Sequence, residues 1–214
     1  MAVSPILVAI VGGSAAGKGT LARALADALP MPTHHLELDA FYRDLSALPP
    51  GRRAARNFDH PASVDWPRVR TVFDGLRAGQ AVEVPEYDFA LHTRRPGGRH
   101  LDPVPVVLWD GLWLLDWSWC RRRFDFGIFV QCEPAACLAR RLQRDVHERG
   151  RTPDSVRQQY RSQVLPQQRR FVEPQRLWAD AVVRSPWDVR TVNRLAEALA
   201  GLAVGFATAR DYAS

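Results

Sequence analysis

Residues 5–20 read PILVAIVGGSAAGKGT, an apolar run followed at once by a glycine-rich loop. The run Pro5–Val11 is short and continuous, which is typical of a strand buried on both faces. From Thr20 to Leu29, leucine and alanine recur at helical spacing, and Pro30 ends the pattern. This order of strand, loop and helix predicts the first unit of an α/β fold with a mainly parallel sheet.

The loop between the two elements has the composition and spacing of a phosphate-binding site. Gly12, Gly17 and Lys18 satisfy the pattern GxxxxGK. Glycines let backbone N–H groups turn toward phosphate oxygens, and the N-terminus of the following helix adds a positive partial charge. An ordinary glycine-rich turn is the alternative, but the strand before and the helix after the loop favour phosphate binding. We therefore predict that a nucleotide is bound by Gly12, Gly13, Ser14, Ala15, Ala16, Gly17, Lys18, Gly19 and Thr20.

The magnesium side of this loop departs from the common pattern at one position. Gly19 stands where a Ser or Thr hydroxyl usually binds Mg²⁺, and we expect the neighbouring Thr20 to substitute in part. Asp39 and Asp110 each follow a predicted strand, and the carboxyl ends of parallel strands face the ligand crevice. Asp39 is thus placed to accept a hydroxyl proton and to help hold magnesium, and Asp110 to contact magnesium as a Walker-B-type carboxylate. Both residues also suit capping or turn roles, so on these residues alone both interpretations stay open.

The rest of the chain alternates between strand and helix patterns. Further strands are expected at His34–Leu38, Val104–Trp109, Phe126–Gln131 and Ala181–Val183, with helices at about residues 66–77, 134–147, 154–171 and 188–202. The alternation predicts helices on both faces of the sheet, in one domain of residues 1–214. Leu48–Pro61 and Pro85–Pro103 have loop composition, the second with room for a small hairpin. The charged break Glu148–Pro153 suits a mobile helical lid at about residues 141–159.

The chain is basic, with a formal net charge of +6 over 214 residues, which suggests an anionic partner. Lys18 is the only lysine among 29 Lys and Arg residues, so the charge reflects an arginine-rich composition rather than a nucleic-acid surface. An RNA-binding protein is the weakest alternative, because the arginines lack interleaved aromatic platforms. No stretch reaches the roughly 18 apolar residues of a membrane span, so neither nucleic acid nor membrane is expected as a partner. The three cysteines form no metal-binding pair and are typical of the reducing cytoplasm, where we expect the protein.

Five further motifs follow the loop. They are LDAFYRDLS, NFDHP (Asn57–Pro61), YDFALHTR (Tyr87–Arg94), RRLQRDVHERGR with the Gln-Gln-Tyr that follows it (Arg140–Tyr160), and WADAVV (Trp178–Val183). Together with the loop they resemble the uridine kinases of the phosphoribulokinase/uridine kinase group of P-loop kinases, over about residues 5–190. The resemblance implies a kinase that uses ATP and Mg²⁺ to phosphorylate the 5′-hydroxyl of uridine or cytidine, giving UMP or CMP in pyrimidine salvage. It also implies small-molecule substrates and a homo-oligomer, with a tetramer favoured.

The resemblance also implies roles for individual residues. Asp39 would be the base for the nucleoside hydroxyl, with Tyr42 beside it. Asp59 would hold the ribose hydroxyls together with Arg141 and Gln159, and a carboxylate suits a diol because it can accept two hydrogen bonds. The other implied residues are Lys18 and Arg144 in catalysis, Phe58 and Phe89 in the base pocket, Tyr87, His92 and Arg151 at the polar edge of the pyrimidine, Arg144 and Arg149 in a lid over the phosphates, and residues 84–103 as a nucleoside-binding insertion.

Three positions depart from the family pattern. Asp110 stands where uridine kinases usually carry Glu, and Gly19 lacks the hydroxyl, so we expect an unusual magnesium dependence. Arg184–Trp187 (RSPW) differs from the glycine-rich loop near the donor base, so ATP rather than GTP rests on the family alone. Two alternatives stay open: a kinase of the same group that acts on another hydroxylated metabolite, and a nucleotide-binding protein with impaired transfer.

Overall fold

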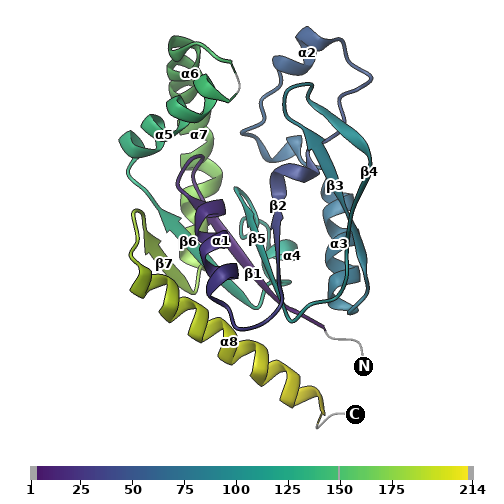
Figure 1. The fold of residues 1–214 in the computed structure, drawn as a ribbon. Helices are drawn as coiled ribbons and strands as arrows, with labels where there is room; N and C mark the ends of the chain where they lie inside the picture. The colour runs from purple at the N-terminus through teal and green to yellow at the C-terminus, as the bar shows by residue number, and fades with distance from the viewer. Residues whose placement is uncertain (1–3, 149, 212–214) are drawn as a thin grey trace.

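The computed structural model describes residues 4–148 and 150–211. Its centre is a five-stranded sheet with the strand order β2-β5-β1-β6-β7, in which every neighbouring pair is parallel (Figure 1). The strands are β1 (Ile6–Gly12), β2 (Thr33–Glu37), β5 (Val106–Gly111), β6 (Phe126–Gln131) and β7 (Ala181–Arg184). Each lies close to a strand predicted from its apolar run, so the predicted parallel sheet is confirmed.

The central position of β1 in the sheet explains why the run Pro5–Val11 is apolar. All of its residues are buried, because β5 pairs with it on one edge and β6 on the other, and a core lies on each face. Leu7, Ala9 and Val11 enter one apolar cluster, and Ile6, Val8 and Ile10 enter the other. Alternate side chains of a strand point to opposite faces, so a strand with a core on both sides has no place for a polar residue.

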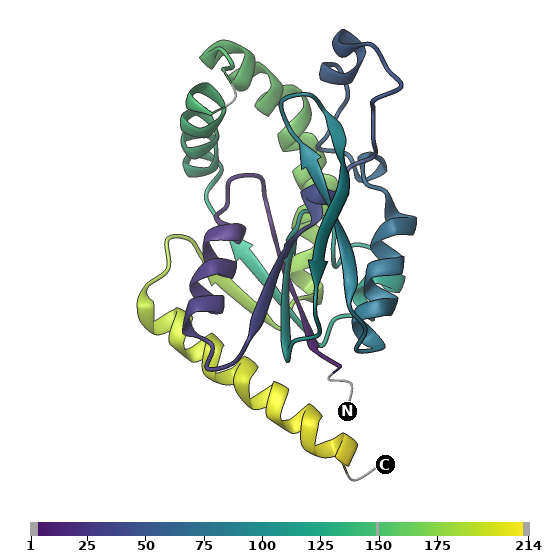
Figure 2. The same ribbon diagram turned by 45° about the vertical axis from the view of Figure 1, so that its right-hand side comes forward.

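Helices cover both faces of the sheet (Figures 1 and 2). α1 (Lys18–Ala28) and α8 (Val189–Asp211) pack on the Ile6 side through residues such as Leu25 and Leu199. α3 (Trp66–Arg77) packs on the Leu7 side and has the predicted bounds, whereas α8 continues past its predicted end near residue 202. No described helix combines the length and the apolar character that a membrane crossing requires.

A two-stranded hairpin replaces most of the loop expected at Pro85–Pro103. β3 (Val82–Asp88) and β4 (Thr93–Leu101) pair in antiparallel register, with an irregularity between Pro85 and Tyr87. The small hairpin allowed for in this segment is therefore present, but the length of β4 was not predicted, because β4 is exposed over most of its length and lacks the apolar alternation that marks a half-buried strand. The short segments η1 (Leu38–Phe41), α2 (Pro50–Ala54), η2 (Pro61–Ser63) and α4 (Ser118–Arg121) complete this part of the chain.

The C-terminal half carries the helices expected to form a lid. α5 (Pro134–His147) and α6 (Pro153–Gln159) flank the charged break, and Arg149 lies outside the described residues. The helix expected at about residues 154–171 continues instead with the wider turns of π-helix. Pro166 lies in this stretch and cannot donate a backbone hydrogen bond, which disfavours a regular α-helix there. The segments are η3 (Tyr160–Val164), α7 (Leu165–Gln167), η4 (Gln168–Val172) and η5 (Glu173–Trp178).

Candidate active site

A cleft of about 1000 Å³ lies at the carboxyl ends of the central strands, between helices α5 and α6 and the β3–β4 hairpin. Residues expected from the sequence form most of its lining: Ser14, Ala15, Lys18, Asp39, Tyr42, Phe58, Asp59, Tyr87, Phe89, His92, Asp110, Arg141, Arg144, Arg151 and Gln159. Arg56, Ala90, Leu112 and Glu148 complete the lining and were not expected. Tertiary folding therefore brings six separate segments of the sequence to one cavity.

The glycine-rich loop has the backbone shape that its sequence predicts. Ala15 and Gly17 have left-handed backbone angles, with φ of 61° and 101°, and α1 begins directly after Gly17. The first backbone N–H groups of α1 therefore point out of the helix beside the loop. Lys18 Nζ donates to the carbonyl oxygen of Gly13 at 3.0 Å, so the ammonium group folds back over the loop. This is an anion-binding arrangement.

The structure distinguishes Gly19 from Thr20 as positions from which a hydroxyl could reach a magnesium ion. Thr20 is exposed and is absent from the residues that line the cleft. A Cβ atom added to Gly19 would instead lie 3.4 Å from Asp110 Oδ2. A side chain at position 19 would thus face the carboxylate, whereas the placement of Thr20 gives no support to the expected substitution.

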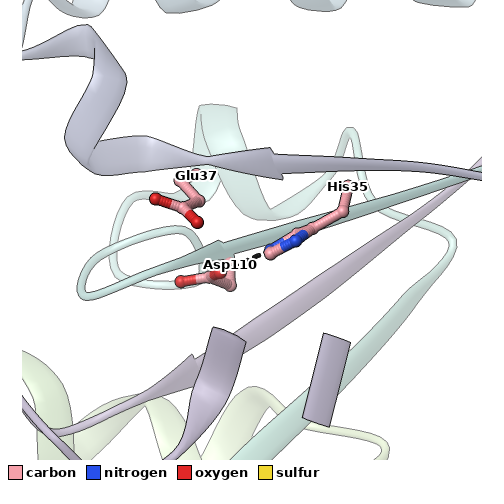
Figure 3. A group of neighbouring side chains, drawn as sticks. All are labelled: His35, Glu37 and Asp110. Carbon is pink, nitrogen blue, oxygen red and sulfur yellow. Dashed lines mark hydrogen bonds and ion pairs between the residues drawn. The ribbon is translucent and has the colours of Figure 1, made fainter. Parts of the chain in front are cut away.

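Asp39 and Asp110 occupy the floor of the cleft from adjacent elements. Asp39 lies in η1, two residues beyond the end of β2, and Asp110 lies in β5, paired in register with Glu37 of β2. Asp110 Oδ2 also contacts His35 Nε2 at 2.6 Å (Figure 3). Desolvation raises the pKa of the Glu37 carboxyl, and the negative charge of Asp110 raises this pKa further. The sequence analysis missed His35 and Glu37, although their alternate positions in a predicted strand place them on one face.

Aromatic side chains contact one another at the far end of the cleft. Tyr42 donates its hydroxyl hydrogen to the carbonyl oxygen of Phe58 at 3.1 Å, and its ring meets Phe58 and Tyr87 edgewise. Phe58 and His92 stack with ring centroids 4.7 Å apart. The Tyr87 hydroxyl is buried and has no hydrogen-bond partner among the described residues. Burial raises the pKa of Tyr87 to about 12, so this hydroxyl stays protonated and can donate to a ligand.

Arg141 links the phosphate side of the cleft to the aromatic side. Its guanidinium donates to Ser14 Oγ at 2.8 Å and to Gln159 Oε1 at 3.1 Å, and lies 3.5 Å from Asp59 Oδ1. Arg141 is 5% exposed and Asp59 is 8% exposed, so these contacts are shielded from water. The expected grouping of Asp59, Arg141 and Gln159 is present in the structure.

Asp145 is a buried carboxylate that the sequence analysis did not assign. It lies inside α5 within ion-pair distance of Arg141, Arg144 and Arg151, at 3.4, 2.9 and 3.7 Å. A carboxylate without exposure needs such partners, because an uncompensated buried charge is strongly unfavourable. Its position four residues after Arg141 in a helix was the available signal. Asp145 therefore orients the arginines that line the cleft.

The sequence profile of the Phosphoribulokinase / Uridine kinase family matches residues 7–192. The chain belongs to this family. It is 39% identical over 183 residues to a uridine kinase of Chloroflexus aggregans, which covers 85% of this chain and 88% of that relative. It is 35% identical over 197 residues to a uridine kinase of Halobacterium salinarum, with 92% and 88% covered. Family membership makes this chain an ATP-dependent kinase.

Solved structures with this fold include kinases that are not described as uridine kinases. A chain from Silicibacter sp. TM1040, provisionally described as a fructose transport system kinase, superimposes with a TM-score of 0.71 at 25% identity, covering 84% of this chain and 90% of that one. A D-glycerate 3-kinase from Cryptococcus neoformans reaches 0.64 at 16% identity, with 85% and 86% covered, and shows the fold alone. Within this fold, the cleft of each member must therefore be considered by itself.

The residues on the floor of the cleft fit a divalent cation. Asp39 and Asp110 supply carboxylate oxygens, which are suitable ligands for Mg²⁺. The hydroxyl ligand of the common pattern is missing at Gly19, and the nitrogen of His35 lies against Asp110 instead. The donor set therefore retains oxygen ligands but differs from an all-oxygen site.

Proposed function

We propose that this family member transfers the γ-phosphoryl group of ATP to the 5′-hydroxyl of uridine or cytidine, as expected for a pyrimidine-salvage kinase. The observation that carries the proposal is the Arg141 contact set, in which one buried guanidinium joins Ser14 of the phosphate-binding loop to Asp59 and Gln159. Arg141 alone would then help to position both a nucleotide on the loop and a sugar on Asp59. Such positioning is the main source of rate enhancement in phosphoryl transfer.

Asp39 is assigned as the general base in this reaction. The carboxylate accepts the proton of the nucleoside hydroxyl, whose oxygen forms a bond to the γ-phosphorus while the bond to the bridging oxygen of ADP breaks. Lys18 and Arg144 offset negative charge on the transferring group and on the leaving ADP. A bound Mg²⁺ would further neutralise the charge of the β- and γ-phosphates.

The far end of the cleft supports a pyrimidine nucleoside as the acceptor. The Asp59 carboxylate can accept hydrogen bonds from two vicinal hydroxyls, and the stacked rings of Phe58 and His92 offer flat apolar surface for a base. The buried hydroxyl of Tyr87 is available to donate to a polar atom of that base. An acceptor without a diol or a planar ring would leave these groups unmatched.

The magnesium side of the cleft supports a second candidate, a protein that binds ATP and nucleoside but transfers slowly. Gly19 lacks the hydroxyl, and Thr20 is exposed outside the lining of the cleft. Asp110 also stands where uridine kinases usually carry Glu, so two usual contacts to the cation would be changed at once. This candidate predicts normal ligand binding with little turnover.

The test is ADP release with ATP and Mg²⁺ over a panel of acceptors: uridine, cytidine, adenosine, ribulose 5-phosphate and none. We expect turnover only with the two pyrimidine nucleosides, and a loss of roughly 10²- to 10⁴-fold in Asp39→Asn. Asp27→Asn, which changes an exposed carboxylate on α1, is the matched control and should leave the rate unchanged.

Direct binding measurements separate the outcomes of that panel. Asp39→Asn should bind ATP and uridine as the wild type does, because the amide keeps the size of the side chain. Turnover with ribulose 5-phosphate, or equal turnover with adenosine, contradicts the assigned acceptor. No turnover in protein that binds both ATP and uridine supports the second candidate.

A further inference from the structure

His35 and Glu37 are brought beside Asp110 by the geometry of the parallel sheet. The two residues are separated by one position on β2, so their side chains lie on the same face of the strand. The register pairs Glu37 with Asp110 on β5, and His35 with the residue two positions earlier on that strand. Figure 3 shows His35 and Glu37 on one strand and Asp110 beside them on the neighbouring strand. The sheet itself therefore builds this group, without any contribution from a loop.

The three side chains carry atoms that metals bind. One ligand atom of each residue lies within 4.8 Å of those of the other two, and the group combines an imidazole with two carboxylates. The side chains of His35 and Asp110 are 16% and 13% exposed, which leaves the group shielded but accessible to a small ion. Two negative charges close together favour a cation between them.

Gly19 lies directly opposite this group. A Cβ atom added there would be 3.4 Å from Asp110 Oδ2 and 4.0 Å from His35 Cε1. A Ser or Thr at this position would thus place its hydroxyl in the space beside His35 and Asp110. Gly19, which lacks the usual hydroxyl ligand, and His35, which offers a nitrogen ligand, therefore both lie beside Asp110.

We propose that His35, Glu37 and Asp110 form a mixed nitrogen–oxygen site that binds a first-row transition-metal dication, with Mn²⁺ preferred over Mg²⁺. Mg²⁺ takes oxygen ligands and dehydrates reluctantly, whereas imidazole nitrogen is a good ligand for the transition metals. The nitrogen of His35 replaces the hydroxyl that Gly19 lacks. The site deepens the proposed function by naming its metal, but it exists or fails independently of which acceptor is phosphorylated.

The competing arrangement needs no metal. The guanidinium of Arg23 lies 3.7 Å from the same added Cβ atom at Gly19, and its charge acts on Glu37. A protonated His35 and Arg23 would then neutralise Asp110 and Glu37 as ion pairs. In that arrangement His35 opposes the binding of a cation, so its removal should strengthen binding rather than weaken it.

The experiment titrates Mn²⁺ into the metal-free full-length chain without nucleotide, and follows free Mn²⁺ by its electron paramagnetic resonance signal. We expect saturable binding of one ion, displaced by Mg²⁺ only at concentrations at least ~10-fold higher. His35→Gln, which keeps a polar side chain but removes the ring nitrogen, should raise the Mn²⁺ dissociation constant at least ~10-fold. His34→Gln is the matched control, because His34 is adjacent on β2 but contacts the carbonyl oxygen of Asp102 instead. It should change the constant less than ~2-fold.

Two further measurements make the result independent of folding defects and of activity. Electron spin-echo modulation from a ¹⁴N nucleus should be present for bound Mn²⁺ in the wild type and in His34→Gln, and absent in His35→Gln. The double variant Gly19→Ser with His35→Gln should regain Mg²⁺ binding relative to His35→Gln alone, because it restores the hydroxyl.

Three outcomes overturn the metal site: no saturable Mn²⁺ binding at millimolar concentration, equal affinity for Mn²⁺ and Mg²⁺, or unchanged or tighter binding in His35→Gln. None of these readouts uses phosphoryl transfer. Failure of the metal site and failure of the acceptor assignment are therefore distinguished by this titration and the acceptor panel.

Discussion

The two ends of the cleft are built in different ways. At the end proposed to bind the acceptor (the acceptor end), successive ring contacts link His92, Phe58, Tyr42 and Tyr87, and Asp59 is held by Arg141. At the end proposed to bind magnesium (the magnesium end), Asp110 contacts His35 across two strands, and Gly19 carries no side chain to meet them. The acceptor end follows the family motifs closely, whereas the magnesium end departs from them at two positions.

The difference has a physical reason. Interlocked side chains constrain one another, because replacing one of them leaves a cavity or an unpaired group among its neighbours. Ligands of a cation are held together mainly by the cation, so one donor can be exchanged for another that reaches the same point. Single substitutions at the acceptor end should therefore change nucleoside binding. Single substitutions at the phosphate-binding loop (the phosphate end) should instead change the rate of turnover. Four predictions follow this contrast, in order of decreasing effect.

Lys18→Met tests the phosphate end and should have the largest effect. The variant removes the ammonium group of the chain's only lysine, and we expect kcat to fall roughly 10²- to 10³-fold, as when one charge-stabilising donor is lost. Uridine binding, measured by calorimetry, should stay within about 2-fold of the wild type because the far end of the cleft is unchanged. Arg190→Met, an exposed cation on α8, is the control. A large loss of uridine binding in Lys18→Met would show that the two ends are not separable.

Asp59→Asn tests the acceptor end with a smaller expected effect. The amide keeps the shape of the side chain but loses the charge that a sugar diol would contact, so the KM for uridine should rise roughly 10- to 100-fold. The KM for ATP should change little. Comparison with 2′-deoxyuridine sharpens the assignment, because the wild type should discriminate against this analogue and the variant should not. Equal discrimination in both proteins would remove Asp59 from the sugar site.

Phe58→Leu weakens the stacked pair with His92. An aromatic pair contributes about 0.5–1.5 kcal/mol beyond its burial, so the KM for uridine should rise roughly 2- to 10-fold with kcat nearly unchanged. Phe206→Leu changes an exposed aromatic residue on α8 and serves as the control. A fall in kcat at unchanged KM would instead assign Phe58 to the positioning of the reacting groups.

Thr20→Ala should have the smallest effect. The residue is exposed and does not line the cleft, so the half-saturating Mg²⁺ concentration should move less than about 2-fold. Gly19→Ser is the informative partner, because it adds a hydroxyl facing Asp110. A large rise in the half-saturating Mg²⁺ concentration of Thr20→Ala would show that the loop rearranges when nucleotide binds.

Some parts of the site could be predicted from sequence motifs and others could not. Asp59 and Arg141 were grouped from motifs, and the structure brings them together. Asp145 was missed because a charged residue inside a helix looks solvated until its burial is known. A small hairpin was allowed for at Pro85–Pro103, but the bounds of β4 were not predicted, because its exposed residues show no apolar alternation. Motifs indicate residues that contact a ligand. They do not indicate residues such as Asp145, which orient the side chains that line the cleft.

The sequence by itself determined the phosphate-binding unit and the parallel sheet, because both depend on local patterns: a buried apolar run, a glycine loop and a helical repeat. Only the tertiary structure decided which side chains lie beside Asp110. The order of strands in the sheet sets β5 beside β2, and this order is not encoded in any single strand. It places Asp110 against His35 and Glu37, although more than 70 residues separate them in the chain. A contact of that kind depends on how the elements are assembled, and the periodicity of each element carries no information about its neighbour.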